Sequence, residues 1–85
     1  MPEYSVLLSK TVTKQLDKLP DPIAGNLIEV IETLAKNPRP HGVKKLKGRE
    51  GYRIRKGDYR IIYEIRDRLL IIEVIAIGHR RDIYD

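Results

Sequence analysis

The sequence predicts an α+β fold in which an N-terminal strand and a helical hairpin pack on one face of a twisted, mainly antiparallel sheet of four to five strands. Apolar residues recur every three or four positions between Val12 and Leu34, as along one side of a helix. After residue 51, short runs rich in isoleucine and tyrosine alternate with turn residues, as in neighbouring strands. The 85 residues suffice for one hydrophobic core but not for two, so residues 1–85 should form a single domain.

A strand and a short helix are expected at the N-terminal end. Residues 4–8 alternate weakly between polar and apolar and end in two leucines, which is typical of a strand. Ser9 can cap the following helix, because its hydroxyl can accept a hydrogen bond from an otherwise unpaired amide of the first turn. Pro20 ends that helix. The apolar stripe of this helix is Val12, Leu16 and Leu19.

The second helix has the clearest pattern in the chain. Asp21 is the expected N-cap and Pro22 the first helical residue, where a missing amide hydrogen does no harm. The helix ends before Pro38, because a residue that precedes proline is forced out of the helical region. The two helices should therefore form a hairpin. The stripe of the second helix is Ile23, Leu27, Val30, Ile31 and Leu34.

Four further strands are expected after a short linker. They span residues 43–47, 52–56, 59–65 and 69–77, with turns at residues 48–51, 57–58 and 67–68. Gly57-Asp58 between two alternating runs indicates a hairpin, because glycine supplies the positive φ that a two-residue turn demands. The last strand is apolar on both faces, as expected for an interior strand.

The hairpin determines which side chains share a face of the sheet. A turn at residues 57–58 pairs Arg55 with Arg60. It also pairs Arg53 with Ile62, so the three arginines project from one face. Like charges directly opposite one another destabilise a strand pair, and a fold tolerates this most readily at a functional site, so the pattern points to phosphate. The opposite face collects an apolar set: Tyr52, Ile54, Tyr59, Ile61 and Tyr63.

Two glutamates are expected to join the arginine face. A turn at residues 67–68 pairs Glu64 with Ile71 and Ile62 with Glu73. These carboxylates could hold the guanidinium groups in position. Alternatively, they form ordinary cross-strand charge pairs on a solvated face, which is the commoner arrangement.

Composition limits the class of protein further. The formal charge of +5 favours an acidic or polyanionic partner, although solubility explains it about as well. The absence of cysteine excludes disulfides and thiolate metal sites, and two isolated histidines argue against any metal, so no cofactor is expected. No signal pattern is evident, and the apolar residues 69–78 are too few to span a bilayer. We therefore expect a cytoplasmic protein without membrane contact.

Several segments, in this order and spacing, resemble the RelE/ParE superfamily of small bacterial toxins, each encoded with an antitoxin that binds and neutralises it. They are the helical hairpin, Leu46-Lys47-Gly48, residues 52–55, residues 57–65 and residues 78–84. The resemblance covers nearly the whole chain and implies a RelE-like fold, a concave basic face that holds messenger RNA, and a cognate antitoxin as partner. Within the superfamily, the RelE branch cleaves mRNA in the ribosomal A site. The ParE branch instead inhibits DNA gyrase and is not a nuclease.

The resemblance assigns RelE-branch roles to five residues of this chain. Arg53 and Arg55 would hold and polarise the scissile phosphate, and Arg60 would bind the same phosphate and stabilise its developing charge. Arg80 would assist the leaving oxygen or bind an adjacent phosphate, and Tyr84 would stack on a base or help to move a proton. RelE itself carries lysines in place of Arg53 and Arg55. Because arginine keeps its proton near neutral pH, neither residue can be the general base, and the identity of the base stays open.

Acid–base groups are scarce in the sequence. Cleavage of RNA by its own 2′-hydroxyl benefits from a proton acceptor, from cations on the phosphate and from a proton donor at the 5′ oxygen. His79 is the possible acid or base, and its alternative role is a strand-end histidine with a backbone hydrogen bond. His41 is expected to be a solvated loop residue. Catalysis should therefore depend mainly on electrostatic stabilisation and on orientation by the ribosome.

A basic run near the proposed groove could follow an RNA backbone, although lysines that protect an exposed edge strand explain it about as well. The candidate RNA-binding residues are Lys44, Lys45, Lys47, Arg49 and Arg81.

The leading interpretation is the toxin of a type II toxin–antitoxin system, a metal-independent, ribosome-dependent endoribonuclease that cleaves mRNA in the A site and inhibits translation. Two alternatives stay open. One is a ParE-like toxin that inhibits DNA gyrase without nuclease activity. The other is a plain RNA- or DNA-binding module, whose affinity should fall steeply with salt. The arginines that face one another favour the nuclease over the gyrase inhibitor.

Overall fold

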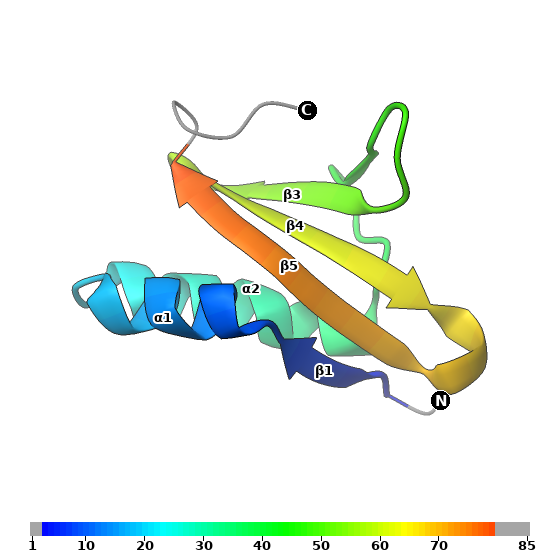
Figure 1. Ribbon diagram of the computed structural model, residues 1–85, viewed down its shortest axis with the longest axis horizontal. Helices are drawn as coiled ribbons and strands as arrows, with labels where there is room; N and C mark the ends of the chain where they lie inside the picture. The colour runs from blue at the N-terminus through cyan, green and yellow to red at the C-terminus, as the bar shows by residue number, and fades with distance from the viewer. Residues whose placement is uncertain (1–2, 80–85) are drawn as a thin grey trace.

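The structure, a computed structural model, describes residues 3–79 and consists of two helices packed on one face of a five-stranded sheet (Figure 1). The order of one strand, two helices and four strands agrees with the prediction. The elements are β1 (Ser5–Leu8), α1 (Lys10–Lys18), α2 (Ile23–Lys36), β2 (Lys44–Lys45), β3 (Tyr52–Lys56), β4 (Tyr59–Arg66), the 3-10 helix η1 (Asp67–Leu69) and β5 (Ile71–His79).

The sheet has the strand order β1-β5-β4-β3-β2. β1 runs parallel to β5 and the other neighbours are antiparallel, so the predicted mainly antiparallel α+β fold is confirmed. β5 lies between β1 and β4, which agrees with the apolar character of both its faces.

The core lies between the helices and one face of the sheet. α2 turns Leu27, Ile31 and Leu34 inward, as its apolar stripe predicts, and α1 adds Val12. Both helices lie on the same side of the sheet in Figure 1. The strands contribute Ile61, Tyr63, Ile72, Val74 and Ile77 to the core.

The helix ends follow the sequence signals with one exception. The Ser9 hydroxyl accepts a hydrogen bond from the Val12 amide at 3.1 Å, as expected of an N-cap. The prediction that Asp21 caps the second helix was wrong. Pro22 takes the N-cap position with φ −90° and ψ 6°, a non-helical conformation, so α2 begins one residue later than expected. α2 ends at Lys36, as the proline that follows predicts.

The connection between β4 and β5 is longer than the predicted two-residue turn. η1 is followed by Leu70, whose backbone is in the left-handed region with φ 55°. Both predicted pairings of the glutamates, with Ile71 and with Ile62, were wrong, because the longer connection places Glu64 opposite Glu73. The two glutamates nevertheless share the face of the arginines, since a shift of two residues preserves the alternation of side chains.

A β-bulge interrupts the ladder between β4 and β5. Tyr63 pairs with Val74, but Ile62 pairs with Ala76, so Ile75 has no opposite partner. One extra residue in a strand reverses the face that each following side chain takes. The bulge therefore determines which side chains after Ile75 lie on the same face of the sheet as the arginines.

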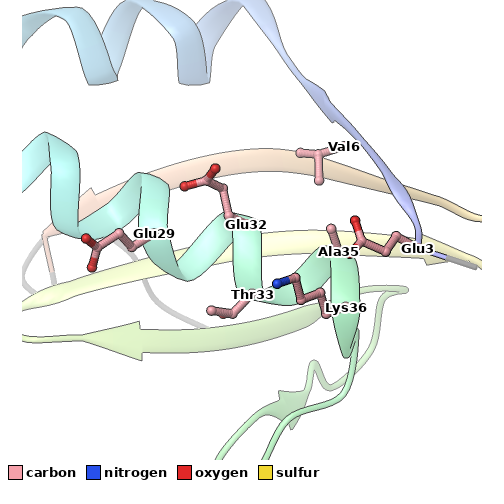
Figure 2. Close-up of a pocket in the computed structure, with 7 residues that line it drawn as sticks. All are labelled: Glu3, Val6, Glu29, Glu32, Thr33, Ala35 and Lys36. Carbon is pink, nitrogen blue, oxygen red and sulfur yellow. The ribbon is translucent and has the colours of Figure 1, made fainter. Parts of the chain in front are cut away.

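A broad hollow of about 540 Å³ separates β1 from the C-terminal half of α2 (Figure 2). Glu29 and Glu32 of α2 line it together with Val6 of β1, and Glu3 also contributes a carboxylate. This hollow is larger than the one beside the arginines, but three of its four charged lining residues are glutamates and the fourth is Lys36. It is therefore unsuited to a phosphate-bearing ligand, which carboxylates repel.

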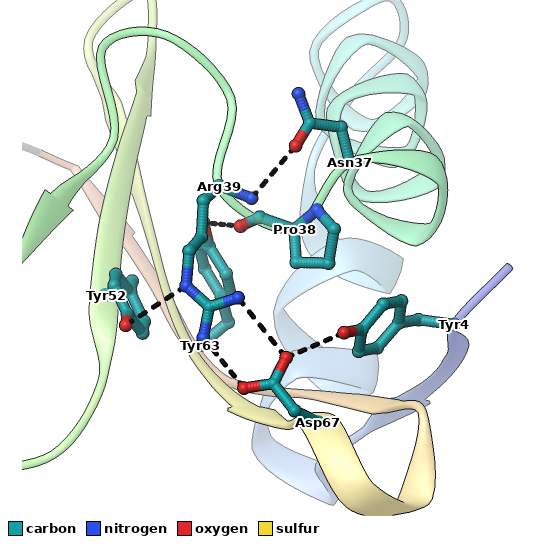
Figure 3. Close-up of polar contacts among 7 residues, drawn as sticks. All are labelled: Tyr4, Asn37, Pro38, Arg39, Tyr52, Tyr63 and Asp67. Carbon is teal, nitrogen blue, oxygen red and sulfur yellow. Dashed lines mark hydrogen bonds and ion pairs between the residues drawn. The ribbon is translucent and has the colours of Figure 1, made fainter. Parts of the chain in front are cut away.

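A polar network connects the linker after α2 to the sheet (Figure 3). Arg39 donates hydrogen bonds to both carboxylate oxygens of Asp67, at 3.2 and 2.9 Å. The Tyr4 hydroxyl donates to the same carboxylate at 2.6 Å, and the Tyr63 hydroxyl donates to the Pro38 carbonyl at 2.7 Å. The network orients the linker and, through it, the start of β2.

Acid is expected to weaken this network. The hydrogen bonds from Arg39, which have the larger effect, and the one from Tyr4 lower the pKa of the Asp67 carboxyl to about 2. The pKa of Asp67 is therefore lower in the folded protein than in the unfolded chain, where it is about 4. The stabilisation that the Asp67 carboxylate gives is complete above about pH 4 and is lost as the pH falls through about 2. Asp67→Asn should therefore lower the melting temperature at neutral pH, and its difference from wild type should shrink below pH 4.

Thermal unfolding followed by circular dichroism, at neutral pH and at two acidic pH values, tests this expectation. Asp17→Asn is the matched control, because Asp17 is an exposed carboxylate on α1. Equal melting temperatures of Asp67→Asn and wild type at neutral pH would contradict the role given to the network.

Candidate nucleic-acid interface

β3 and β4 present three arginines on the face of the sheet opposite the helices. The register places Arg55 opposite Arg60 and Arg53 opposite Ile62, as predicted. Gly57 has φ 60°, the positive value that the two-residue turn requires. The predicted apolar set of the two strands packs against the core on the other face. Guanidinium groups from two neighbouring strands therefore lie on one side of the sheet.

The three arginines differ in exposure. Arg53 is buried, with a relative exposure of 7%, whereas Arg60 is half-buried and Arg55 is exposed. Burial lowers the pKa of Arg53, and the positive charges of Arg55 and Arg60 lower it further. Arginine still keeps its proton near neutral pH, so the site holds fixed cations that repel one another. Such a cluster attracts an anion.

A hollow of about 300 Å³ opens beside β3 and next to these arginines. β2 supplies one wall, because Lys44 pairs with Arg53 across the strands. The remaining lining comes from the linker before β2 and from the end of β3. The lining residues are His41, Gly42, Lys44, Arg53, Ile54 and Arg55.

Comparison with known proteins gives the family. A sequence profile of the ParE toxin of the type II toxin-antitoxin system parDE matches residues 6–84. The chain belongs to the RelE/ParE toxin superfamily. Toxin RelE of Mycobacterium tuberculosis is 35% identical to this chain over 83 residues, which cover 95% of this chain and 86% of the relative. Toxin RelE3 of Methanocaldococcus jannaschii is 35% identical over 85 residues, with 94% of each chain covered.

A solved structure of the superfamily confirms the RelE-like fold. The archaeal RelE–RelB complex from Pyrococcus horikoshii OT3 contains a chain that superposes on this RelE/ParE toxin with a TM-score of 0.84 and 31% identity. The match covers 95% of this chain and 99% of the other.

The glutamates of the arginine face are paired with a fourth arginine. Arg66 of the toxin donates to Glu64 at 3.2 Å and to Glu73 at 2.9 Å. The same guanidinium thus offsets the repulsion between two carboxylates that lie opposite one another. Within residues 3–79, these contacts favour ordinary cross-strand pairing over a role in holding the three phosphate-binding candidates.

His79 lies on the helical face and not on the arginine face. It pairs with Tyr59, and the two rings meet edge to face with centroids 5.4 Å apart. Tyr59 packs against the core, so His79 shares the face of the helices. The β-bulge reverses this part of β5, which sequence alternation alone does not reveal. This position argues against the acid or base role considered for His79.

The basic run does not form a single surface. Lys44 lines the hollow beside the arginines, whereas Lys45 lines a separate hollow with Arg39 and Tyr52. Lys47 and Arg49 are exposed in the loop between β2 and β3. Of the predicted RNA-binding residues in the described part of the chain, Lys44 is thus the one that shares a hollow with the arginine cluster. The remaining predicted site residues, Arg80, Arg81 and Tyr84, lie outside the described residues.

Sequence reasoning missed His41 as a site residue. It is exposed, as expected for a loop, but the fold brings it to the wall of the arginine hollow. The signal in the sequence was the glycine that follows it, which marks a turn just before the basic strand.

Two further features of residues 3–79 concern cofactors and membranes. No group of three or more histidine, cysteine, aspartate or glutamate side chains lies together there in a way that could hold a metal ion. Neither helix of this region has the length and apolar character needed to cross a bilayer.

Proposed function

We propose that this protein is a ribosome-dependent endoribonuclease that cleaves mRNA in the A site and so inhibits translation in the cytoplasm. The observation that carries the proposal is the convergence of Arg53, Arg55 and Arg60 on the face of the sheet opposite the helices. The RelE names of its relatives support the nuclease branch of the superfamily.

The arginine cluster suits an RNA phosphate. Each guanidinium can donate two parallel hydrogen bonds to phosphate oxygens, and a phosphate bound between Arg55 and Arg60, which lie opposite one another, would relieve the repulsion between their charges. Arg53 is buried, so its charge acts in a region of lower dielectric, where attraction to a developing negative charge is stronger. The cluster would bind the scissile phosphate and stabilise the transition state without a metal ion.

The remaining site residues complete the proposal. Arg80 would assist the leaving oxygen, and Tyr84 would stack on a base or move a proton. The ribosome would supply much of the substrate orientation, since the protein offers few acid–base groups. Lys44, Lys45, Lys47, Arg49 and Arg81 would contact the RNA backbone, with affinity that falls as salt rises.

An antitoxin is the proposed protein partner. Several solved relatives of this chain are complexes of RelE with RelB, among them the archaeal complex described above. A segment that folds on contact would cover the basic face and compete with RNA for the arginines.

A second function rests on one specific observation. The profile that matches residues 6–84 describes ParE toxins, and the ParE branch inhibits DNA gyrase without cutting RNA. In that case the same basic face would engage a protein partner.

Ribosomes programmed with a defined mRNA separate these functions. We expect purified protein to cut the mRNA within the A-site codon, mapped by primer extension to the new 5′ ends, and to leave the same mRNA intact without ribosomes. Intact mRNA on programmed ribosomes, together with inhibition of gyrase in a supercoiling assay, would replace the nuclease with the ParE-type function.

A further inference from the structure

The proposed nuclease reaction needs a proton acceptor that the arginines do not provide. The 2′-hydroxyl must lose its proton to attack the adjacent phosphorus, and a guanidinium cannot accept one near neutral pH. Glu64 and Glu73 share the arginine face but are engaged by Arg66. His79 lies on the helical face, against Tyr59. Within residues 3–79, these candidates are therefore poorly placed to act at the arginines.

His41 is positioned by a tight turn at the wall of the arginine hollow. The Val43 amide donates to the Pro40 carbonyl at 3.2 Å, which closes a four-residue turn. Gly42 occupies the third position with φ 91°, a value that glycine adopts without strain and that a type II turn requires there. His41 is thus the second residue of a defined turn and not part of an unstructured loop.

Strand pairing brings this turn to the phosphate-binding candidates. Lys44 pairs with Arg53, so the chain that precedes Lys44 runs beside the end of β3. His41, Arg53 and Arg55 consequently line one hollow of about 300 Å³. A hollow of this volume can admit a phosphate with its attached ribose. The His41 side chain is exposed and is one of those that line this hollow.

We propose that His41 is the general base of the cleavage reaction, an inference that rests on the proposed ribonuclease function. An imidazole nitrogen accepts the proton of the ribose 2′-hydroxyl while the 2′-oxygen forms a bond to phosphorus. The bond from phosphorus to the 5′ oxygen breaks, and that oxygen takes a proton from water. The products are a 2′,3′-cyclic phosphate and a 5′-hydroxyl, and His41 returns its proton to solvent.

The charges around His41 suit this role. Lys44 of β2 and Arg53 and Arg55 of β3 line the same hollow, and all three are cations. The same cations attract the phosphate, so the acceptor and the reacting group are brought to one place.

Single-turnover cleavage of mRNA on programmed ribosomes tests the proposal. His41→Ala and His41→Gln should cut about 10²–10⁴-fold more slowly than wild type. Added imidazole should restore part of the rate to His41→Ala, because a free base can enter the space left by the side chain. His79→Ala is the matched control and should cut at the wild-type rate. Both His41 variants should melt like the wild type, since His41 is exposed. Thermal unfolding checks that His79→Ala, which loses the ring contact with Tyr59, is folded at the temperature of the assay.

A modified substrate distinguishes a base from an acid. When sulfur replaces the 5′ bridging oxygen, the leaving group departs without a proton, so a variant that lacks the general acid recovers its rate. His41→Ala should remain slow on this substrate. Recovery would overturn the assignment, and so would a wild-type rate of His41→Ala on normal mRNA or the lack of any response to imidazole. If the wild-type protein itself leaves mRNA intact, the proposed ribonuclease function is wrong. If the wild type cuts mRNA and His41→Ala cuts it equally fast, only the role given to His41 is wrong.

Discussion

Replacing Arg60 with alanine is expected to slow the proposed mRNA cleavage by about 10²–10³-fold, the loss that follows removal of one fixed donor to a developing negative charge. Arg60 lies on β4 directly opposite Arg55, and its Nε atom is buried. The side chain is thus held close to the sheet at a defined point. Since alanine removes both the charge and the paired N–H donors, the transition state loses stabilisation that water cannot replace in this partly buried position.

Two further variants separate position from net charge. Arg68→Ala removes the same charge from an exposed site in η1 and should cut at nearly the wild-type rate. Arg60→Lys keeps the charge but loses the planar fork, and its rate should fall between those of wild type and Arg60→Ala. Thermal unfolding checks that each variant is folded. Equal losses in Arg68→Ala and Arg60→Ala would show that overall charge, and not the cluster, governs cleavage.

Replacing Tyr63 with alanine is expected to destabilise the domain by about 3–5 kcal/mol, as for other large aromatic residues removed from a core. Tyr63 is fully buried and stacks on Tyr52 with ring centroids 5.9 Å apart. Its hydroxyl also holds the Pro38 carbonyl. Small domains unfold with about 5–15 kcal/mol in total, so this single change should remove a large share of the stability.

Urea denaturation followed by circular dichroism measures this loss. Tyr63→Phe is the matched control, because it keeps the ring and removes only the hydroxyl, and it should cost about 1–3 kcal/mol through the carbonyl left without its donor. A free energy of unfolding for Tyr63→Ala within 1 kcal/mol of wild type would contradict the packing described for β4.

The arginine cluster and the hollow between β1 and α2 differ in charge. Arg53, Arg55 and Arg60 make one face basic, whereas Glu29 and Glu32 border the hollow between β1 and α2. The formal charge of +5 averages over this difference. A polyanion is therefore drawn to the arginine face and repelled from the acidic hollow, which orients it before contact.

Local signals were sufficient for most of the secondary structure and for the arginine face. Ser9 caps α1 as its hydroxyl predicts, and the apolar spacing of α2 identifies the residues that enter the core. Gly57 sets the hairpin turn, and the turn sets the pairing of Arg55 with Arg60. These features depend on residues that are close in the chain, where turn chemistry and the alternation of side chains leave one arrangement.

The sequence by itself thus determined the α+β fold, the helical hairpin and the grouping of three guanidinium groups on one face. Only the tertiary structure decided that His79 turns away from them and that His41 approaches them. The bulge beside Ile62 depends on how β5 packs against its neighbours, and the place of His41 depends on β2 pairing with β3. These pairings join consecutive strands, but their register is selected by packing over the whole sheet, which no local pattern of residues encodes.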